Sequence, residues 1–182
     1  MSEEIPAWAY ERAEIRPHDP RWAVRAETER AHLADLLGPW LVDGIEHIGS
    51  TAVPGLAAKP IVDLAASVTD LDTAVAATSE HLTAAGWSFV PPELDQRPWR
   101  RFFVKPDPTG RRREAHLHLI QAGHKRWTDQ IRFRDALRRD PTKAQQYEDL
   151  KRQLSQANGH DREAYTEGKA AFVASVLAAS IE

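Results

Sequence analysis

Cysteine is absent from the 182 residues, which excludes disulfide frameworks, thiolate zinc sites and cysteine nucleophiles. The first ten residues, MSEEIPAWAY, are acidic and lack a long apolar run. They indicate neither a secretory signal nor a membrane span, so we expect a cytoplasmic location and no membrane partner. An excess of basic residues is also absent, because 24 Lys and Arg oppose 27 Asp and Glu for a net charge of -3. This balance argues against nucleic acid as a partner.

The composition that remains is typical of a soluble globular protein, with 42% hydrophobic and 28% charged residues. A chain of this length can enclose one good core, and it shows no internal repeat or low-complexity linker that would divide it. We therefore expect residues 1–182 to form one domain, with a sheet-containing half at about 20–121 and a helical half at about 122–182.

Hydrophobic periodicity and turn residues predict the secondary structure. Short apolar runs indicate strands at 41–48, 61–68, 87–90, 100–105 and 114–120. Helical spacing of apolar residues indicates helices at 20–37, 70–85, 125–139, 142–157 and 162–181. The last two strands flank KPDPTGRRR, whose prolines and glycine favour a hairpin. This order predicts an α+β fold: a mixed β-sheet with flanking helices and a C-terminal helical segment packed on it.

Large aromatic side chains dominate burial in a domain of this size. Trp8 precedes the first predicted helix, and we expect it in a mobile tail. The other tryptophans are expected as core or cleft-edge anchors: Trp22, Trp40, Trp87, Trp99 and Trp127.

Four segments carry a resemblance to a known family. The central segment is EHIGSTAVPGLAAKPIVDL, and the later ones are FRDALRRDP, YEDLKRQL and REAYTEGKAAF. Together they resemble the GrpB family, and the agreement runs over nearly the whole chain. That family is similar in fold to the nucleotidyltransferase superfamily of polymerase-beta type, in which a Gly-Ser turn precedes a strand bearing paired aspartates. The resemblance implies this fold and, as the ligand, a nucleotide or another phosphorylated small molecule.

The triplet Gly49, Ser50 and Thr51 follows a predicted strand and is the first candidate for phosphate binding. Glycine lets the backbone pass close to a phosphate, and hydroxyls and amides can donate hydrogen bonds to its oxygens. A helix that began at this turn would add the attraction of its N-terminal dipole. Such triplets also make ordinary turns. Lys59, in the same loop, is assigned to the same ligand-binding set.

Asp63 is the single charge in the apolar run PIVDLAA. An ionised carboxylate there requires a cation, a donor or water, so it is either a magnesium ligand or a structural acceptor of hydrogen bonds from Lys59 or the preceding loop. In nucleotidyltransferases a second acid follows two residues later, where strand alternation points both into one cleft. This chain has Ala65 at that position.

A second strand offers replacements for the missing acid. In EAHLHLI a period of two places Glu114, His116 and His118 on one face. With Asp63, the two histidines could bind a transition metal such as zinc, iron, manganese or nickel. They could instead donate to phosphate, act as general bases, or be hydrogen-bonded strand histidines. His47 is a weaker member of the same group.

The helical half supplies cations that could clamp a polyphosphate above the sheet. Taken singly, these charges are also explained by solvated helix faces and local ion pairs. The family resemblance selects Arg134, Asp135, Lys151, Tyr165 and Lys169.

Two functions follow from these residues. The first is an enzyme that passes a nucleotidyl or related group to a small acceptor, with Asp63, His116 and His118 catalytic and with Mg²⁺, Mn²⁺ or a histidine-bound transition metal as cofactor. The second is a binding module that kept the cleft and lost the transfer chemistry, which Ala65 favours. A pocket adapted to other biosynthetic chemistry through the two histidines is a further alternative. All of these require the Ser50 turn, Asp63 and both histidines to converge on one solvent-reachable hollow.

Overall fold

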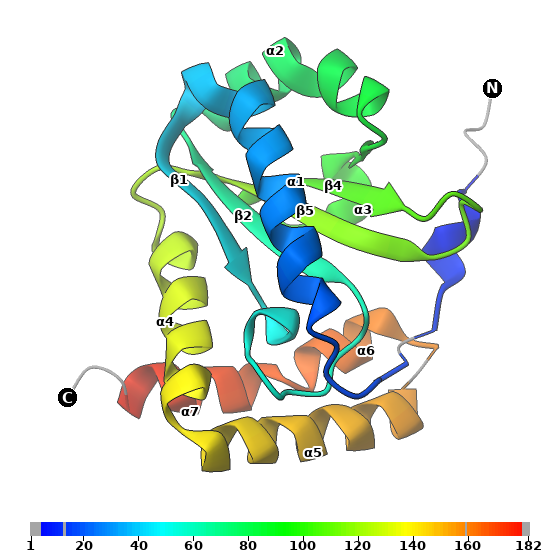
Figure 1. The fold of residues 1–182 in the computed structure, drawn as a ribbon, viewed down its shortest axis with the longest axis vertical. Coiled ribbons are helices and arrows are strands. Elements are labelled where there is room, and N and C mark those ends of the chain that lie inside the picture. Colours follow the sequence, from blue (N-terminus) through cyan, green and yellow to red (C-terminus); the bar gives the residue numbers. More distant parts are fainter. Residues whose placement is uncertain (1–4, 13, 159, 180–182) are drawn as a thin grey trace.

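Figure 1 shows the protein as a computed structural model that describes residues 5–12, 14–158 and 160–179. Its centre is a five-stranded sheet in the order β1-β2-β5-β4-β3. The strands are β1 (Leu41–Ile48), β2 (Val62–Val68), β3 (Ser88–Val90), β4 (Arg100–Pro106) and β5 (Arg113–Gln121). β2 and β5 are parallel and the other neighbours antiparallel, which confirms the predicted mixed sheet and the hairpin of β4 and β5.

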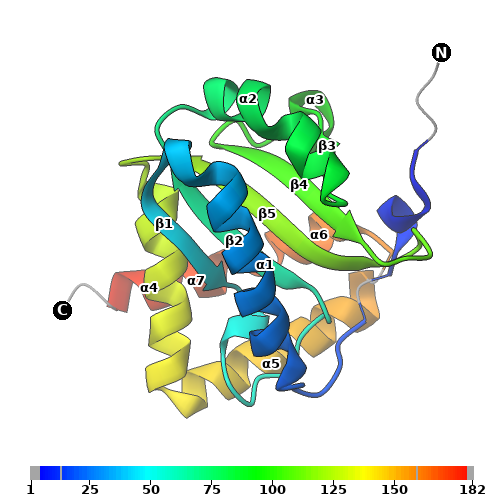
Figure 2. The ribbon, with the colours of Figure 1, turned by 45° about the horizontal axis from the view of Figure 1, so that its top comes forward.

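Helices α1 (Arg21–Leu37) and α2 (Leu71–Ala84) cover one face of the sheet (Figure 1, Figure 2). Asp70 caps α2 by accepting a hydrogen bond of 2.8 Å from the amide of Thr73. The alternate residues of the strands turn inward here and form the main core with the helices. Its largest buried members include Trp87, Phe103, Leu33, Leu64 and Leu117.

The opposite face is covered only in part. Helix α4 (Lys125–Arg139) packs Trp127 against Ile48, Ala65 and Ile120 near β1. Helices α5 (Pro141–Asn158), α6 (Arg162–Glu167) and α7 (Ala170–Ala179) continue from α4 and pass below the sheet (Figure 1). The β5 and β4 part of this face, which carries His116, His118 and Phe102, stays open as the floor of a cavity. Among the described helices, none is long and apolar enough to cross a membrane.

The last predicted helix, 162–181, is two helices in the structure. α6 ends at Glu167, with Gly168 as its C-cap, and α7 begins at Ala170, while residues 180–182 lie outside the described part of the chain. A Cβ atom at Gly168 would collide with the Leu154 side chain of α5, so the close approach of the two helices depends on this glycine. The short helix α3 (Pro92–Asp95) was also not predicted.

A β-bulge corrects the predicted face of Glu114. Lys105 pairs with Ala115, but Pro106 pairs with Arg113, so Glu114 is an extra residue opposite β4. The alternation of side chains is interrupted there, and Glu114 contacts Arg25 of α1 at 3.5 Å on the covered face. Arg113 lies on the open face with the histidines instead, so the expectation that Glu114 joins them is wrong.

The N-terminal segment is packed against the sheet, and the expectation of a mobile tail around Trp8 is wrong. Residues Ala7–Tyr10 form a 3₁₀ helix, and Trp8 is buried against Phe102 and Val104 at the open end of β4. The Arg113 guanidinium lies 4.8 Å from the centre of the Trp8 ring. Further along, Arg16 forms an isolated β-bridge with Ala58. The segment therefore forms one wall of the cavity.

We expect Trp8→Ala to lower the free energy of unfolding by about 3 kcal/mol, because it removes a large buried ring that contacts Phe102 and Val104. Urea unfolding followed by circular dichroism measures the change. Tyr10→Ala is the matched control, since Tyr10 is on the same 3₁₀ helix but 71% exposed, and its effect should stay below about 0.5 kcal/mol. Equal effects of the two substitutions would contradict the packing role of Trp8.

Candidate functional site

The parallel register of β2 and β5 places Asp63 beside His116, with His118 diagonally adjacent on the same face. Asp63 Oδ1 lies 2.9 Å from His116 Nδ1 and 3.3 Å from His118 Nε2. Burial alone would raise the pKa of Asp63, but the two imidazole hydrogen bonds outweigh it and hold that pKa below its ordinary value. Burial lowers the pKa of both histidines, that of His116 to about 4. The cluster is therefore an ionised carboxylate between two neutral imidazoles.

A buried ion pair continues this cluster on β4. The Arg100 guanidinium donates to Asp95 through Nε at 2.8 Å and Nη2 at 2.5 Å, and its Nη1 lies 2.5 Å from His118 Nδ1. Arg100 is 9% exposed and Asp95 7%. Burial makes this pair costly to break, so it fixes the ring of His118. Phe102 packs between the two imidazoles, with ring centres 5.0 Å from His116 and 5.2 Å from His118.

The predicted phosphate turn is a three-residue 3₁₀ helix, Ser50–Ala52, and not the start of an α-helix. The N-terminal dipole that a longer helix would add is therefore missing at this position. Thr51 is 3% exposed, and its hydroxyl contacts the carbonyl of Ile61 at 3.2 Å and His47 Nε2 at 3.0 Å. Ser50 lines the cavity and hydrogen-bonds the side chain of Tyr147.

Gly49 brings this turn against Asp63. Its φ of 73° and ψ of -172° lie in a region that is accessible essentially only to glycine. A Cβ atom at Gly49 would stand 2.8 Å from Asp63 Oδ2. The close approach of the turn to the acid therefore requires glycine.

Three lysines line the opposite wall, two of them over the ring of Tyr165 and the third, Lys151, with its Nζ 5.1 Å from the centre of the Tyr147 ring. Lys59 Nζ lies 3.8 Å and Lys169 Nζ 4.5 Å from the centre of the Tyr165 ring. Lys151 of α5 is 2% exposed and donates to the carbonyl of Ala57. Burial, and then the nearby Lys169, lower the pKa of Lys151 to about 7. Burial also lowers the pKa of Lys169.

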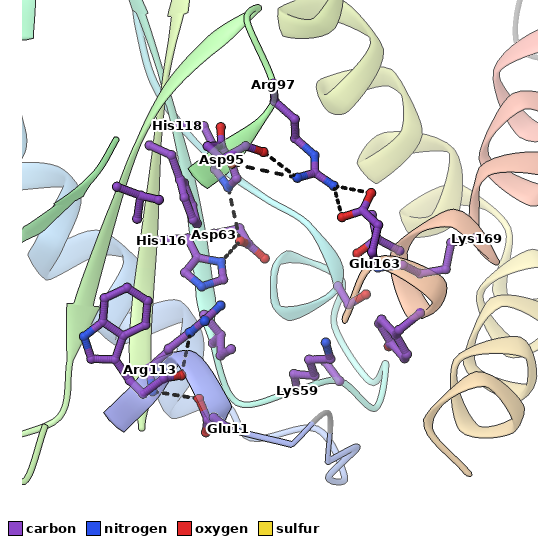
Figure 3. Close-up of a pocket in the computed structure, with 18 of the residues that line it drawn as sticks. Glu11, Lys59, Asp63, Asp95, Arg97, Arg113, His116, His118, Glu163 and Lys169 are labelled. Carbon is purple, nitrogen blue, oxygen red and sulfur yellow. Dashed lines mark hydrogen bonds and ion pairs between the residues drawn. The ribbon is translucent and has the colours of Figure 1, made fainter. Parts of the chain in front are cut away.

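The two walls enclose a cavity of about 380 Å³ (Figure 3). Ser50, Thr51, Asp63 and both histidines line it, as the sequence analysis required, together with Lys59, Lys151, Tyr165 and Lys169. Seven lining residues are Lys or Arg and four are Asp or Glu, although the whole chain has a net charge of -3. Basic side chains are thus concentrated in this cavity, which suits an anionic ligand.

Several predicted candidates do not line the cavity. Arg134 is 8% exposed and donates from Nη1 to Glu46 at 2.5 Å and to the carbonyl of His47 at 2.9 Å, while its Nε pairs with Asp135. Arg134 thus links α4 to the end of β1 and does not face the lysines. His47 binds Thr51, and burial lowers its pKa to about 4.

Other lining residues were missed in the sequence. Arg97 joins Asp95 to Glu163, with two hydrogen bonds of 2.9 Å to the Glu163 carboxylate (Figure 3). This pair connects the loop after α3 with α6. Arg100 and Phe102 are two residues apart on β4, so strand alternation could have placed both on the open face. Asp95 and Glu163 are on short helices and carried no comparable signal.

The donor atoms permit a first test of metal binding. Asp63, His116 and His118 each offer one ligand atom, and these atoms lie within 4.8 Å of one another. Magnesium prefers several oxygen ligands, and this cluster supplies one carboxylate. Ala65 points to the same face but is fully buried among Ile48, Ile120 and Trp127, so no second acid stands there.

The mixed sheet, its flanking helices and the basic cavity define an α+β protein with a candidate site for an anionic ligand. A profile described as "GrpB protein" matches residues 12–179, and the chain belongs to the GrpB family. A UPF0157 protein of Deinococcus radiodurans is 36% identical over 168 residues, covering 92% of this chain and 82% of that relative. A UPF0157 protein of Pseudomonas aeruginosa is 40% identical over 176 residues, covering 92% of this chain and 67% of the relative.

A solved structure has the same fold. The crystal structure of the conserved protein GrpB from Enterococcus faecalis superposes with a TM-score of 0.79 and 29% identity, covering 92% of this chain and 97% of that one. Cid1, an RNA terminal uridylyl transferase, aligns over 68% of this chain and 40% of its own with 16% identity and a TM-score of 0.43. The fold assignment comes from the GrpB structure.

We expect Gly49→Ala to lower the free energy of unfolding by about 3 kcal/mol, because backbone strain adds to a clash with Asp63 Oδ2. Gly55→Ala is the matched control, since Gly55 also has a positive φ, of 79°, but its Cβ would meet nothing within 4 Å. Its cost should be about 1–2 kcal/mol. Urea unfolding of both variants makes the comparison, and an equal loss would show that the approach to Asp63 is not tight.

Proposed function

We propose that the cavity binds a nucleotide or another phosphorylated small molecule. The observation that carries the proposal is the group of three lysines, Lys59, Lys151 and Lys169, on the wall opposite Asp63. Among the described residues, neither Lys151 nor Lys169 forms an ion pair with a carboxylate, and both have a lowered pKa. Buried cations without a counterion are costly, and an anion that entered between them would relieve this cost.

The shape of the site suits a ligand with both a phosphate and a larger organic part. Lys59, Lys151 and Lys169 gather at one end with Ser50, where phosphate oxygens would find cations and a hydroxyl. The other end is formed by Trp8 and Phe102 and offers aromatic and apolar surface. A nucleotide combines these two chemical parts.

Nucleotidyl transfer is the narrower form of this proposal. Transfer with two metal ions needs a cluster of acids, and Asp63 stands alone because Ala65 is enclosed by apolar side chains. A divalent cation would enter with the phosphates of the ligand, and Asp63 of β2 is the acid that would meet it. We therefore place binding first and treat turnover as a separate question for experiment.

We expect Lys151→Met to weaken binding of adenosine triphosphate by about 10- to 100-fold, because it removes a charged donor from a buried phosphate site. Isothermal titration calorimetry measures the affinity. Lys143→Met is the matched control, since Lys143 lies on the same helix, pairs with Asp140 and does not line the cavity. If neither inorganic pyrophosphate nor any nucleotide binds the unaltered protein at millimolar concentration, the proposed function is wrong.

Binding should weaken as the pH rises. Lys151 has a pKa of about 7 without ligand, and an anion favours its charged form, so binding above pH 7 takes up a proton. We expect the affinity for adenosine triphosphate to fall by up to about tenfold per pH unit between pH 7.5 and 9. Calorimetry at several pH values measures this fall, and Lys151→Arg should flatten it because arginine stays charged.

The stability of the ligand-free protein should change in the opposite direction. The folded pKa of Lys151, about 7, lies below its value of roughly 10.4 in an unfolded chain. Between these values the unfolded chain binds more protons, so the contribution of Lys151 to the free energy of unfolding rises with pH. We expect the melting temperature to rise less from pH 7 to 9 in Lys151→Met than in the unaltered protein. Identical pH profiles of the two proteins would contradict the lowered pKa of Lys151.

Turnover is tested by incubating the protein with adenosine triphosphate, Mg²⁺ and candidate small acceptors while released pyrophosphate is measured. Release that Asp63→Asn abolishes in a folded protein would assign transfer to this site. Binding without release over long incubation would assign a binding module. The Lys143→Met variant again serves as the control for general damage.

A further inference from the structure

We infer that His116 and His118 are hydrogen-bond donors that position Asp63, and that Arg100 prevents them from forming a resident metal site. The inference concerns the protons on the two rings, so it stands whether or not the cavity binds a nucleotide. It makes Arg100 and Asp95 positioning residues of the site. It also disagrees with the metal site that one carboxylate and two imidazoles would otherwise suggest.

The first step is the fixed direction of the Arg100 guanidinium. Asp95 holds it through two hydrogen bonds, of 2.8 Å and 2.5 Å, and both side chains are buried. Nη1 is left facing His118 Nδ1 at 2.5 Å. Arginine stays protonated and has only donors, so His118 Nδ1 must be the acceptor in this contact.

The second step is the tautomer of His118. A neutral imidazole whose Nδ1 accepts carries its proton on Nε2, and this N–H points to Asp63 Oδ1 at 3.3 Å. Because an Arg100 N–H faces Nδ1, that nitrogen cannot also carry a proton, and the ring keeps one proton. A metal needs the lone pair of Nε2. Moving the proton to Nδ1 would set it against an Arg100 N–H at 2.5 Å, which is two donors face to face.

The tautomer of His116 is fixed by Asp63. Its Nδ1 lies 2.9 Å from Asp63 Oδ1, and because an ionised carboxylate only accepts, Nδ1 carries the proton. Its Nε2 is buried and has no hydrogen-bond partner among the described residues. Both rings thus donate to one oxygen of Asp63. Figure 3 shows the other oxygen directed away from both imidazoles, toward the wall that carries Lys59 and Lys169.

Nuclear magnetic resonance of the unaltered protein tests the tautomers directly. Long-range proton–nitrogen correlations of ¹⁵N-labelled histidine rings distinguish a protonated Nδ1 from a protonated Nε2. His116→Gln and His118→Gln provide the assignments. We expect the proton on Nε2 in His118 and on Nδ1 in His116. The reverse tautomer in His118, or an imidazolium at neutral pH, would overturn the inference.

Cobalt binding to the full-length chain tests the consequence without any substrate. The double variant Arg100→Gln/Asp95→Asn replaces the fixed donor with an amide whose oxygen can accept from His118 Nδ1, and it leaves no unpaired buried carboxylate. Asp95→Asn alone keeps Arg100 and is the matched control. We expect the double variant to bind Co²⁺ at least about tenfold more tightly than the control, as followed by visible absorption and calorimetry.

Two results would contradict this expectation. Equal Co²⁺ affinity in the double variant and the control would show that Arg100 does not block the site. Stoichiometric micromolar binding by the unaltered protein, lost in His118→Gln, would show a resident metal site despite Arg100. A failure of the nucleotide titrations leaves the ring tautomers unchanged, so it can be distinguished from a failure of this inference.

Discussion

Because β2 and β5 run parallel, Asp63 lies beside His116 on the open face, and donors from the neighbouring strand keep this half-buried carboxylate ionised. The same register puts Ala65 beside His118. Gly49 then approaches Asp63 so closely that no larger residue fits. The turn, the acid and the two imidazoles therefore form one unit, and a shift of either strand by one residue would turn half of it to the core.

The loop after this turn joins the unit to the helical half. Val53 and Leu56 pack against Leu137 and Tyr147, and the carbonyl of Ala57 accepts from Lys151. Hydrophobic packing of the loop thus decides where the buried lysine lies. The lysines of the cavity are positioned by ordinary packing, because the loop that follows β1 contacts Tyr147 of α5 and Tyr165 of α6.

Periodicity and turn residues predicted nearly every strand and helix, because most elements bury one regular face. The failures have local causes. The bulge at Glu114 interrupts a period of two, and no residue type announces it. Gly168 lies where α6 packs closely against Leu154 of α5, and the sequence of one helix does not reveal its contact with another. Trp8 was misplaced because an aromatic residue outside any periodic segment gives no sign of its partner.

The site was predictable only where a pattern or the family resemblance pointed to it. Period two identified His116 and His118, and the resemblance selected Lys151 and Lys169, all of which line the cavity. Arg134 came from the same resemblance and braces β1 instead. Hydrogen-bond partners such as Arg100 and Asp95 depend on pairing across strands and loops, so composition and spacing could not supply them.

Ala65 shows why the two histidines are not substitutes for a second acid. A carboxylate at that position would be enclosed by the apolar side chains of Ile48, Ile120 and Trp127, which makes its charge costly. The residue beside Ala65 on β5 is His118, which Arg100 keeps protonated on Nε2. His118 therefore offers a hydrogen-bond donor where an acid would offer lone pairs to a metal. Two metal ions would then have too few ligands. In our proposal the positive charge opposite the ligand phosphates comes from Lys59, Lys151 and Lys169, and this explains why basic residues gather in the cavity of an acidic chain.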